Sequence, residues 1–193
     1  HVYVTEIDLT NPYVRLDTMI GTDGVITRTQ TVSSMAQKAG AVAAVNGDFF
    51  QMKEKAPLGV ALQNGELAAS PIQRSDMYSF GLTTEKLPVF QVFKFSGLVS
   101  APNGAQRELF GMNKPSYLAA NGISSDIDRL NMYTPKWGVN SRGALAGLTG
   151  TVELVVSQGI VKEIRLDQPG TAVPVDGYVL AGHGSAGQFL NQN

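Results

Sequence analysis

Apolar and polar side chains alternate along much of the chain, and this pattern predicts short strands. The first two alternating runs cover residues 2–9 and 14–20, and Asn11-Pro12 lies between them as a turn signal. The chain is therefore expected to open with a β-hairpin.

The dipeptide Asn64-Gly65 predicts a second hairpin, because both of its positions tolerate the positive φ of a tight turn. Its strands would be residues 59–63 and 66–69. Further runs with strand character follow at residues 78–83 and 89–99. Residues 152–156 are expected to pair with residues 160–166 across Ser157-Gln158-Gly159.

A capped helix is predicted at residues 31–39. Thr31 is a hydroxyl N-cap, Lys38 places a positive charge in the last turn, and Gly40 is a typical stop. The apolar run 41–45 follows directly and is typical of a strand that is buried on both faces.

These elements predict an α+β fold, with a twisted, mostly antiparallel or mixed sheet and one principal helix at about 31–39. Residues 101–150 are the least regular stretch and predict a looped middle region. Glycine and proline are spread evenly, so residues 1–193 are expected to form a single domain without a linker.

Composition narrows the classes of partner and chemistry. The net charge of −1 provides no long-range field that would attract nucleic acid, so nucleic acid is not an expected partner. No apolar run approaches the roughly 20 residues that span a bilayer, so membrane insertion is not expected. The absence of cysteine excludes thiolate catalysis and disulfides. With two histidines, a histidine metal site is not expected, no cofactor is expected, and a metal requirement stays open.

The segment from Asn46 to Phe50 combines the side chains that a sugar site needs. The side-chain amide of Asn46 can donate and accept hydrogen bonds, and Gly47 permits close approach of the backbone. Asp48 supplies a carboxylate, and Phe49 and Phe50 can stack on a sugar. The alternative is a turn in which the two phenylalanines fill the core and Asp48 caps the backbone. Spacing alone leaves both interpretations open.

Four segments together resemble the phosphodiester glycosidase family, whose members include the uncovering enzyme and bacterial proteins assigned to exopolysaccharide biosynthesis. The resemblance begins with the predicted helix, the run 40–45 and the motif 46–50. It continues downstream in residues 57–60 with 63–67, in Tyr-Thr-Pro-Lys-Trp-Gly at 133–138, and in Val-Pro-Val-Asp-Gly-Tyr-Val-Leu at 173–180.

The resemblance implies hydrolysis of a glycosyl phosphodiester, such as one carrying N-acetylglucosamine, in bacterial cell-envelope or exopolysaccharide metabolism. Asp48 and Asn46 would be catalytic, because such a reaction passes through an oxocarbenium-like centre that a carboxylate stabilises. The expected substrate-binding residues are Gly47, Phe49, Phe50, Arg74, Arg142 and Trp137. The arginines would bind phosphate, and Trp137 would either stack on the sugar or anchor the core.

The resemblance also implies a protein longer than this chain. The family's later motifs, including Asp-Gly-Gly-Gly-Ser, have no counterpart before Asn193, so the chain is expected to be the N-terminal part of the domain and to lack some of the catalytic groups. We expect a secreted or cell-surface bacterial protein that can also form a homodimer. The alternative is a non-catalytic glycan-binding or structural module.

One further motif resembles a nucleotide site. Residues 182–187 match Gly-x-Gly-x-x-Gly after a strand, but no second strand or ribose-binding acid can follow in the six remaining residues. A helix that begins near Ser185 could instead bind an anion.

Overall fold

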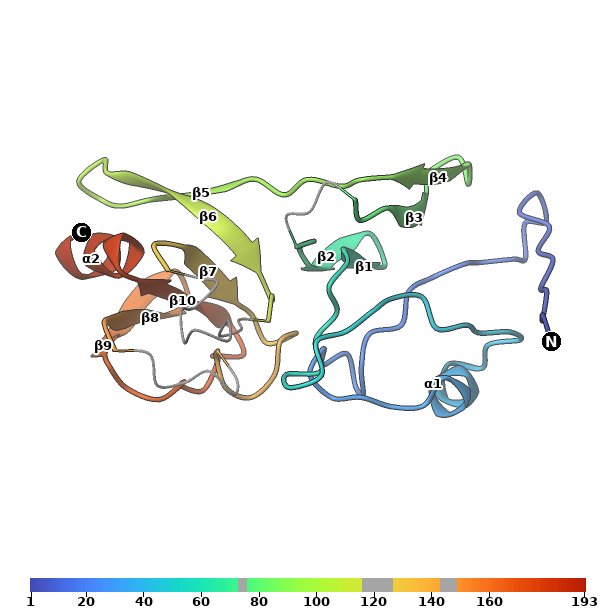
Figure 1. Cartoon of the computed structure of the whole chain (residues 1–193), viewed down its shortest axis with the longest axis horizontal. Coiled ribbons are helices and arrows are strands. Elements are labelled where there is room, and N and C mark those ends of the chain that lie inside the picture. The colour runs from blue at the N-terminus through green and yellow to red at the C-terminus, as the bar shows by residue number, and fades with distance from the viewer. Residues whose placement is uncertain (73–75, 116–126, 143–148) are drawn as a thin grey trace.

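The computed structural model describes residues 1–72, 76–115, 127–142 and 149–193 (Figure 1). The regular structure of the described part is mostly sheet, with ten strands and two helices of eight residues each. Its largest element is a six-stranded sheet. The strands follow in the order β5 (Gly97–Ser100), β6 (Gln106–Met112), β7 (Leu130–Tyr133), β10 (Gly177–His183), β8 (Thr151–Ser157) and β9 (Ile160–Leu166).

Neighbouring strands of this sheet run antiparallel except for β6 and β7, which are parallel. The predicted mixed, mainly antiparallel sheet is therefore confirmed. The β8–β9 connection forms at Gln158 and Gly159, whose φ angles of 54° and 73° match the turn that suits a two-residue hairpin.

Helix α2 (Ser185–Gln192) covers one face of the sheet, on the left of Figure 1. It buries Ala186 and Leu190 against apolar side chains from the strands, which are Leu109, Leu130, Val152 and Leu180. This contact makes the first of two hydrophobic cores.

Helix α1 (Val32–Ala39) forms where the sequence predicted it, but it is not the principal helix. Thr31 accepts a hydrogen bond from the backbone N–H of Ser34, and Gly40 has a φ of 64°, so both caps are confirmed. The helix buries none of its residues. The expectation of one principal helix is wrong, because capping depends on local sequence whereas the contact with the sheet is made by α2.

Two hairpins lie beside the main sheet. The hairpin β1–β2 (Ala61–Gln63 and Glu66–Ala69) confirms the prediction for Asn64-Gly65, with φ angles of 53° and 79°. The second hairpin pairs β3 (Ser79–Leu82) with β4 (Pro88–Gln91). The predicted single strand at 89–99 is instead divided between β4 and β5, which belong to different sheets.

The hairpin predicted at residues 2–9 and 14–20 does not form. Neither does the buried strand at 41–45. Val2 and Val42 are fully or almost fully exposed, at 88% and 105%. An apolar run becomes a buried strand only where partners supply hydrogen bonds and cover both faces, and the described residues supply none for these runs.

The middle region 101–150 is more regular than expected, because it contains β6 and β7. Asn113, directly after β6, connects this region to the hairpin β1–β2. Its side-chain amide donates to the carbonyl of Ala68 at 2.7 Å, and its backbone N–H donates to the carbonyl of Met132 at 2.8 Å. The hairpin is thereby attached to the main sheet.

The second core lies between this hairpin and the main sheet. It contains Tyr133 and Trp137, whose ring centroids are 5.1 Å apart, together with small apolar side chains such as Ala68 and Val179. Tilted aromatic pairs at this separation are favourable beyond the area they bury.

Candidate functional site

The motif residue Asp48 lies at the base of a loop that turns back on itself, and we call residues 48–59 the Asp48 loop. The backbone N–H of Gln51 donates to the carbonyl of Ala56 at 2.9 Å, and that of Leu58 donates to Phe49 at 3.0 Å. Phe50 and Pro57 form an isolated antiparallel bridge between the two arms. The loop is therefore a compact unit that follows the motif directly.

The carboxylate of Asp48 closes the base of this loop. One oxygen accepts the N–H of Phe49 at 2.7 Å, and the other accepts the N–H of Gly59 at 2.8 Å. A Cβ atom on Gly59 would lie 2.9 Å from that second oxygen, so the close approach requires glycine. The proposed catalytic carboxyl is thus held in one orientation.

Burial raises the pKa of the Asp48 carboxyl above its ordinary value of 3.8. The N–H groups of Gly59 and Phe49 and the positive charge of Lys114 oppose this rise. A carboxyl with a raised pKa holds its proton to a higher pH, which is the adjustment that acid–base catalysis by a carboxyl needs.

The other motif residues surround Asp48 and are open to solvent. The side-chain amide of Asn46 lies 3.5 Å from the carbonyl oxygen of Asp48, and Gly47 has no atom near its would-be Cβ. Phe49 and Phe50 are 78% and 45% exposed, so they do not fill the core. Two exposed aromatic rings beside a carboxyl are suited to stacking on a sugar.

Lys114 belongs to the same site, although the sequence analysis did not identify it. It is almost fully buried, and its ammonium group donates to the carbonyl oxygens of Pro57, Leu58 and Gly59 at 3.2, 3.0 and 3.1 Å. Burial lowers its pKa to about 7, and the charge of Asp48 opposes this effect. The sequence offered only a weak signal, a lysine between an asparagine and a proline in the stretch that was predicted to be looped.

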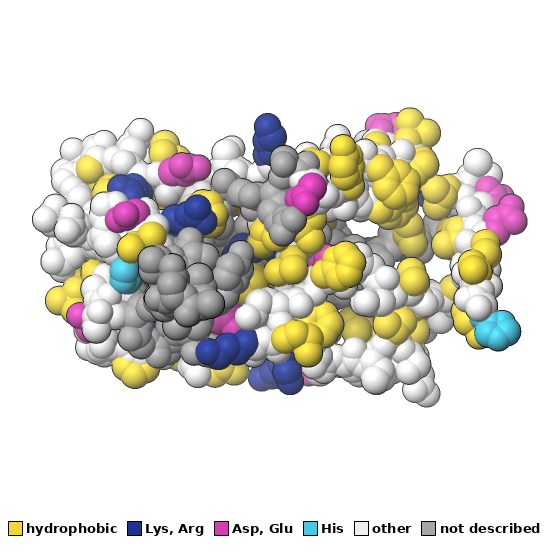
Figure 2. All heavy atoms as spheres, in the orientation of Figure 1, with side chains coloured by type: hydrophobic (Ala, Val, Ile, Leu, Met, Phe, Trp, Pro, Cys, Tyr) yellow, Lys and Arg dark blue, Asp and Glu magenta, His cyan; other side chains and the backbone are white. Residues whose placement is uncertain are grey.

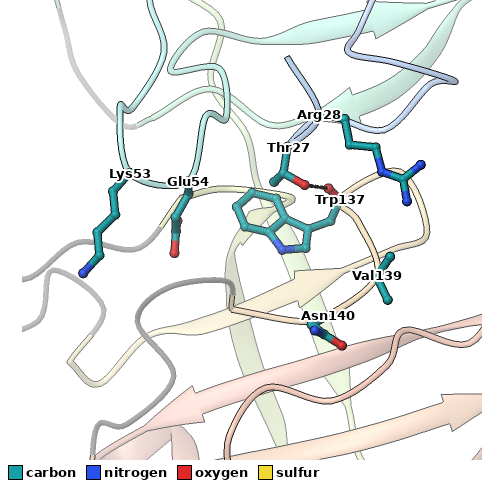
Figure 3. A pocket seen from close by; sticks show the side chains of 7 residues that line it. All are labelled: Thr27, Arg28, Lys53, Glu54, Trp137, Val139 and Asn140. Carbon is teal, nitrogen blue, oxygen red and sulfur yellow. Dashed lines mark hydrogen bonds between the residues drawn. The ribbon is translucent and has the colours of Figure 1, made fainter. Parts of the chain in front are cut away.

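An open pocket lies at the far end of the Asp48 loop and has a volume of about 320 Å³. Figure 3 shows the indole of Trp137 between Lys53 and Glu54 on one side and Arg28 on the other. The remaining lining residues are Thr27, Val139 and Asn140. Trp137 itself is 1% exposed, so its main role is to anchor the core.

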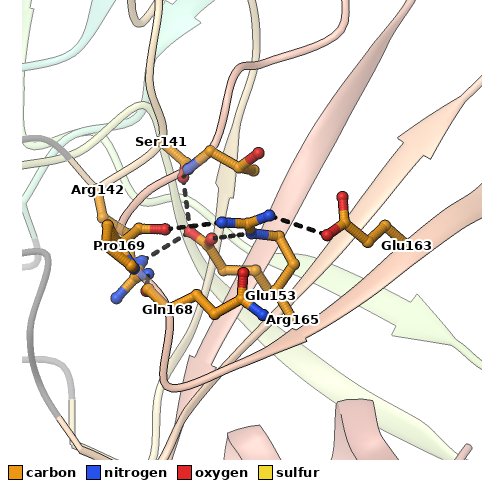
Figure 4. A network of polar contacts seen from close by, with 8 residues as sticks. Ser141, Arg142, Glu153, Glu163, Arg165, Gln168 and Pro169 are labelled. Atoms are coloured by element: carbon orange, nitrogen blue, oxygen red, sulfur yellow. Dashed lines mark hydrogen bonds and ion pairs between the residues drawn. The ribbon is translucent and has the colours of Figure 1, made fainter.

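Arg142, expected to bind phosphate, is instead part of a buried ionic network (Figure 4). Its Nε donates to Glu153 at 2.6 Å, and the same carboxylate oxygen accepts the hydroxyl of Ser141 at 2.6 Å. Arg165 lies on the other oxygen of Glu153, at 3.8 Å. Arg142 is 7% exposed and its guanidinium pairs with a buried carboxylate, so the structure does not present it on an open surface. Arg74 lies outside the described residues.

A carboxylate of the protein itself binds the N-terminus of α2. The carboxylate of Asp128 accepts the backbone N–H of Ser185 at 2.7 Å, and Arg107 donates to the hydroxyl of Ser185 at 2.8 Å. At the glycine pattern 182–187, the Asp128 carboxylate therefore lies at the helix N-terminus, where an anionic ligand would otherwise bind.

Within the described ranges, no three histidine, aspartate or glutamate side chains lie together in a way that could hold a metal ion. No helix of the same ranges is long and apolar enough to cross a membrane.

Comparisons with known proteins show the fold and leave the activity open. No family model and no curated protein matches the chain. A solved structure of a hypothetical protein from Synechocystis matches with a TM-score of 0.72 and 18% identity, over 90% of this chain and 31% of that protein. A Burkholderia pseudomallei K96243 protein, described provisionally as exported, matches with a TM-score of 0.62 and 21% identity, over 84% of this chain and 37% of its own length. The chain thus spans about a third of each of these proteins.

Proposed function

We propose that this chain carries part of the active site of a secreted or cell-surface bacterial hydrolase that cleaves glycosyl phosphodiesters. The observation that carries the proposal is the Asp48 carboxyl, held by two backbone N–H groups, with a raised pKa and exposed aromatic rings beside it. This arrangement meets the need of glycosyl transfer for an oriented carboxyl near an oxocarbenium-like centre.

The pocket at the far end of the Asp48 loop offers groups that a charged sugar could contact. Arg28 and Lys53 supply positive charge to its lining, Glu54 supplies a carboxyl group, and Asn140 adds a polar side chain that can bind hydroxyl groups. Because the matching proteins are about three times longer, we expect further groups of the site to come from a longer polypeptide.

Release of free N-acetylglucosamine from an N-acetylglucosamine phosphodiester tests this proposal, measured with and without Asp48→Asn in a polypeptide extended to the length of the matching proteins. We expect Asp48→Asn to reduce kcat/KM by at least about 100-fold, because loss of a catalytic carboxyl removes proton transfer. Asp8→Asn is the matched control, since Asp8 also accepts a backbone N–H in a turn, from Thr10.

The pH profile adds a second readout to the same assay. The raised pKa of Asp48 predicts that kcat/KM changes through an ionisation above pH 3.8, and that this ionisation disappears in Asp48→Asn. A folded Asp48→Asn protein with full activity would contradict the proposal.

The second candidate is a glycan-binding module without catalysis, favoured by the exposure of Phe49 and Phe50. Calorimetric titration with N-acetylglucosamine oligosaccharides distinguishes it. Binding that is lost in Phe49→Ala, in a protein that releases no sugar even when its sequence is extended to the length of its relatives, would favour this alternative.

A further inference from the structure

We propose that Lys114 is a positioning residue that sets the orientation and the proton affinity of Asp48 through the peptide group between Leu58 and Gly59. The importance of this role for hydrolysis rests on the proposed function. The physical coupling between the two side chains does not.

The peptide group between Leu58 and Gly59 connects the two charged side chains directly. Its carbonyl oxygen accepts from the Lys114 ammonium at 3.0 Å, and its N–H donates to the Asp48 carboxylate at 2.8 Å. Hydrogen bonds in such a chain polarise one another, so a cation at the oxygen makes the N–H a stronger donor. Lys114 therefore stabilises the ionised form of Asp48.

The ammonium group is fixed in place by its full set of acceptors. An ammonium has three N–H donors, and the carbonyl oxygens of Pro57, Leu58 and Gly59 occupy all three. Three carbonyls from consecutive residues converge on one point only if the loop keeps a single conformation. Lys114 thus holds the arm of the Asp48 loop that carries Gly59.

The direction of the lysine side chain is set by the end of β6. Asn113 has a φ of 52°, which turns the chain there, and its amide group bonds to Ala68 and to the side chain and backbone of Thr134. Gly111 leaves room for the lysine stem, since a Cβ atom there would lie 3.1 Å from Cγ of Lys114. The main sheet thereby aims Lys114 at the Asp48 loop.

The two charges shift each other's pKa. The charge of Lys114 lowers the pKa of Asp48, and the charge of Asp48 raises the pKa of Lys114. Lys114, with its pKa of about 7, carries its positive charge at acidic pH. Removal of its charge should therefore raise the pKa of Asp48 further.

Carbon-13 NMR of the aspartate carboxyl groups tests the coupling without any substrate. We expect Lys114→Met to raise the pKa of Asp48 by about one unit or more, as loss of a nearby opposite charge does. Lys114→Arg keeps the charge, so we expect it to restore most of the wild-type value. Lys86→Met is the matched control, because Lys86 also donates to two backbone carbonyls, those of Asn11 and Val14.

An unchanged pKa of Asp48 in a folded Lys114→Met protein would overturn the inference. If Lys114→Met does not fold, nitrogen-15 NMR of the lysine side chains decides the question in Asp48→Asn. Loss of the Asp48 charge should lower the pKa of Lys114, and an unchanged value would again overturn the inference. Because neither readout involves sugar release, a failed hydrolysis assay would count against the proposed function and leave this result standing.

Discussion

Gly47 precedes Asp48 in the chain and Gly59 donates to the Asp48 carboxyl group, but the two glycines have very different surroundings. A Cβ atom on Gly59 would lie 2.9 and 3.1 Å from the two carboxylate oxygens, whereas one on Gly47 would meet no atom within 4 Å. The hydrogen bond from Gly59 to Asp48 leaves no room for a methyl group.

We therefore predict that Gly59→Ala lowers the free energy of unfolding by about 1–3 kcal/mol, the usual cost of inserting a methyl group into packed structure. Gly47→Ala is the control and should change it by less than about 0.5 kcal/mol, as substitutions at open sites do. Urea denaturation measures both. Equal stability of the two variants would contradict the close packing of Asp48 on Gly59.

At the scale of residues, the sequence identified Asp48 but missed Lys114. Asp48 lies in a motif of contiguous residues, and its role as a loop-closing acceptor also depends on Gly59, only eleven positions away. Lys114 reaches carbonyl oxygens 55–57 positions away, and no local pattern encodes such a contact. The partner of Arg142 is Glu153 on β8, only eleven positions away, but a sequence pattern does not show that this carboxylate is buried.

At the scale of elements, the two helices differ in what their caps achieve. Helix α1 has a hydroxyl N-cap and a glycine stop within its own sequence, yet it buries none of its residues. Helix α2 has no side-chain cap of its own on Gly184 and relies on Asp128, which lies 57 positions away. The helix with the weaker sequence signal is the one that completes a core.

We predict that Asp128→Ala lowers the melting temperature by several degrees at neutral pH, because Ser185 loses its acceptor at the helix N-terminus. The hydrogen bonds from Ser185 lower the pKa of Asp128 below 3.8. Its stabilising effect is therefore present above pH 3.8 and is lost as the pH falls through the lowered pKa. The two melting curves should converge in that acidic range.

Thermal scans at a series of pH values measure this difference. Asp176→Ala serves as the control, because Asp176 accepts a hydrogen bond from the hydroxyl of Ser157 and caps no helix. A difference between wild type and Asp128→Ala that does not shrink as the pH falls below 3.8 would contradict the assignment of Asp128 as the cap.

At the scale of the whole molecule, apolar side chains gather on the outer surface around the β3–β4 hairpin (Figure 2). Phe80 and Phe90 are direct cross-strand partners with ring centroids 5.1 Å apart, yet both remain at least half exposed. A two-stranded sheet is only marginally stable by itself, and exposed apolar patches promote association. The hairpin is thus a candidate contact for the expected homodimer.

We predict that the 193-residue chain associates as its concentration rises, and that Phe80→Ser with Phe90→Ser shifts it toward the monomer. Val175→Ser is the control, because Val175 is also exposed, at 92%, but lies between β9 and β10, outside the hairpin. Sedimentation velocity over a range of concentrations measures the effect. A wild type that stays monomeric throughout would contradict the predicted homodimer.

The sequence by itself determined the features that depend on neighbouring residues. These are the caps of α1, the turn at Asn64-Gly65, the hairpin β8–β9 and the mainly sheet character. In each case, the φ preference or the alternation of a few adjacent side chains is sufficient to select the conformation.

Only the tertiary structure decided which apolar runs become buried strands, which helix covers the sheet and which charged groups face each other. Residues 2–9 and 41–45 have strand patterns and remain exposed, because burial needs partner segments that an alternation pattern does not specify. Lys114 and Asp48 bond to the same peptide group because the fold does supply partner segments there. The end of β6 and the Asp48 loop meet through long-range contacts, and these contacts create the site.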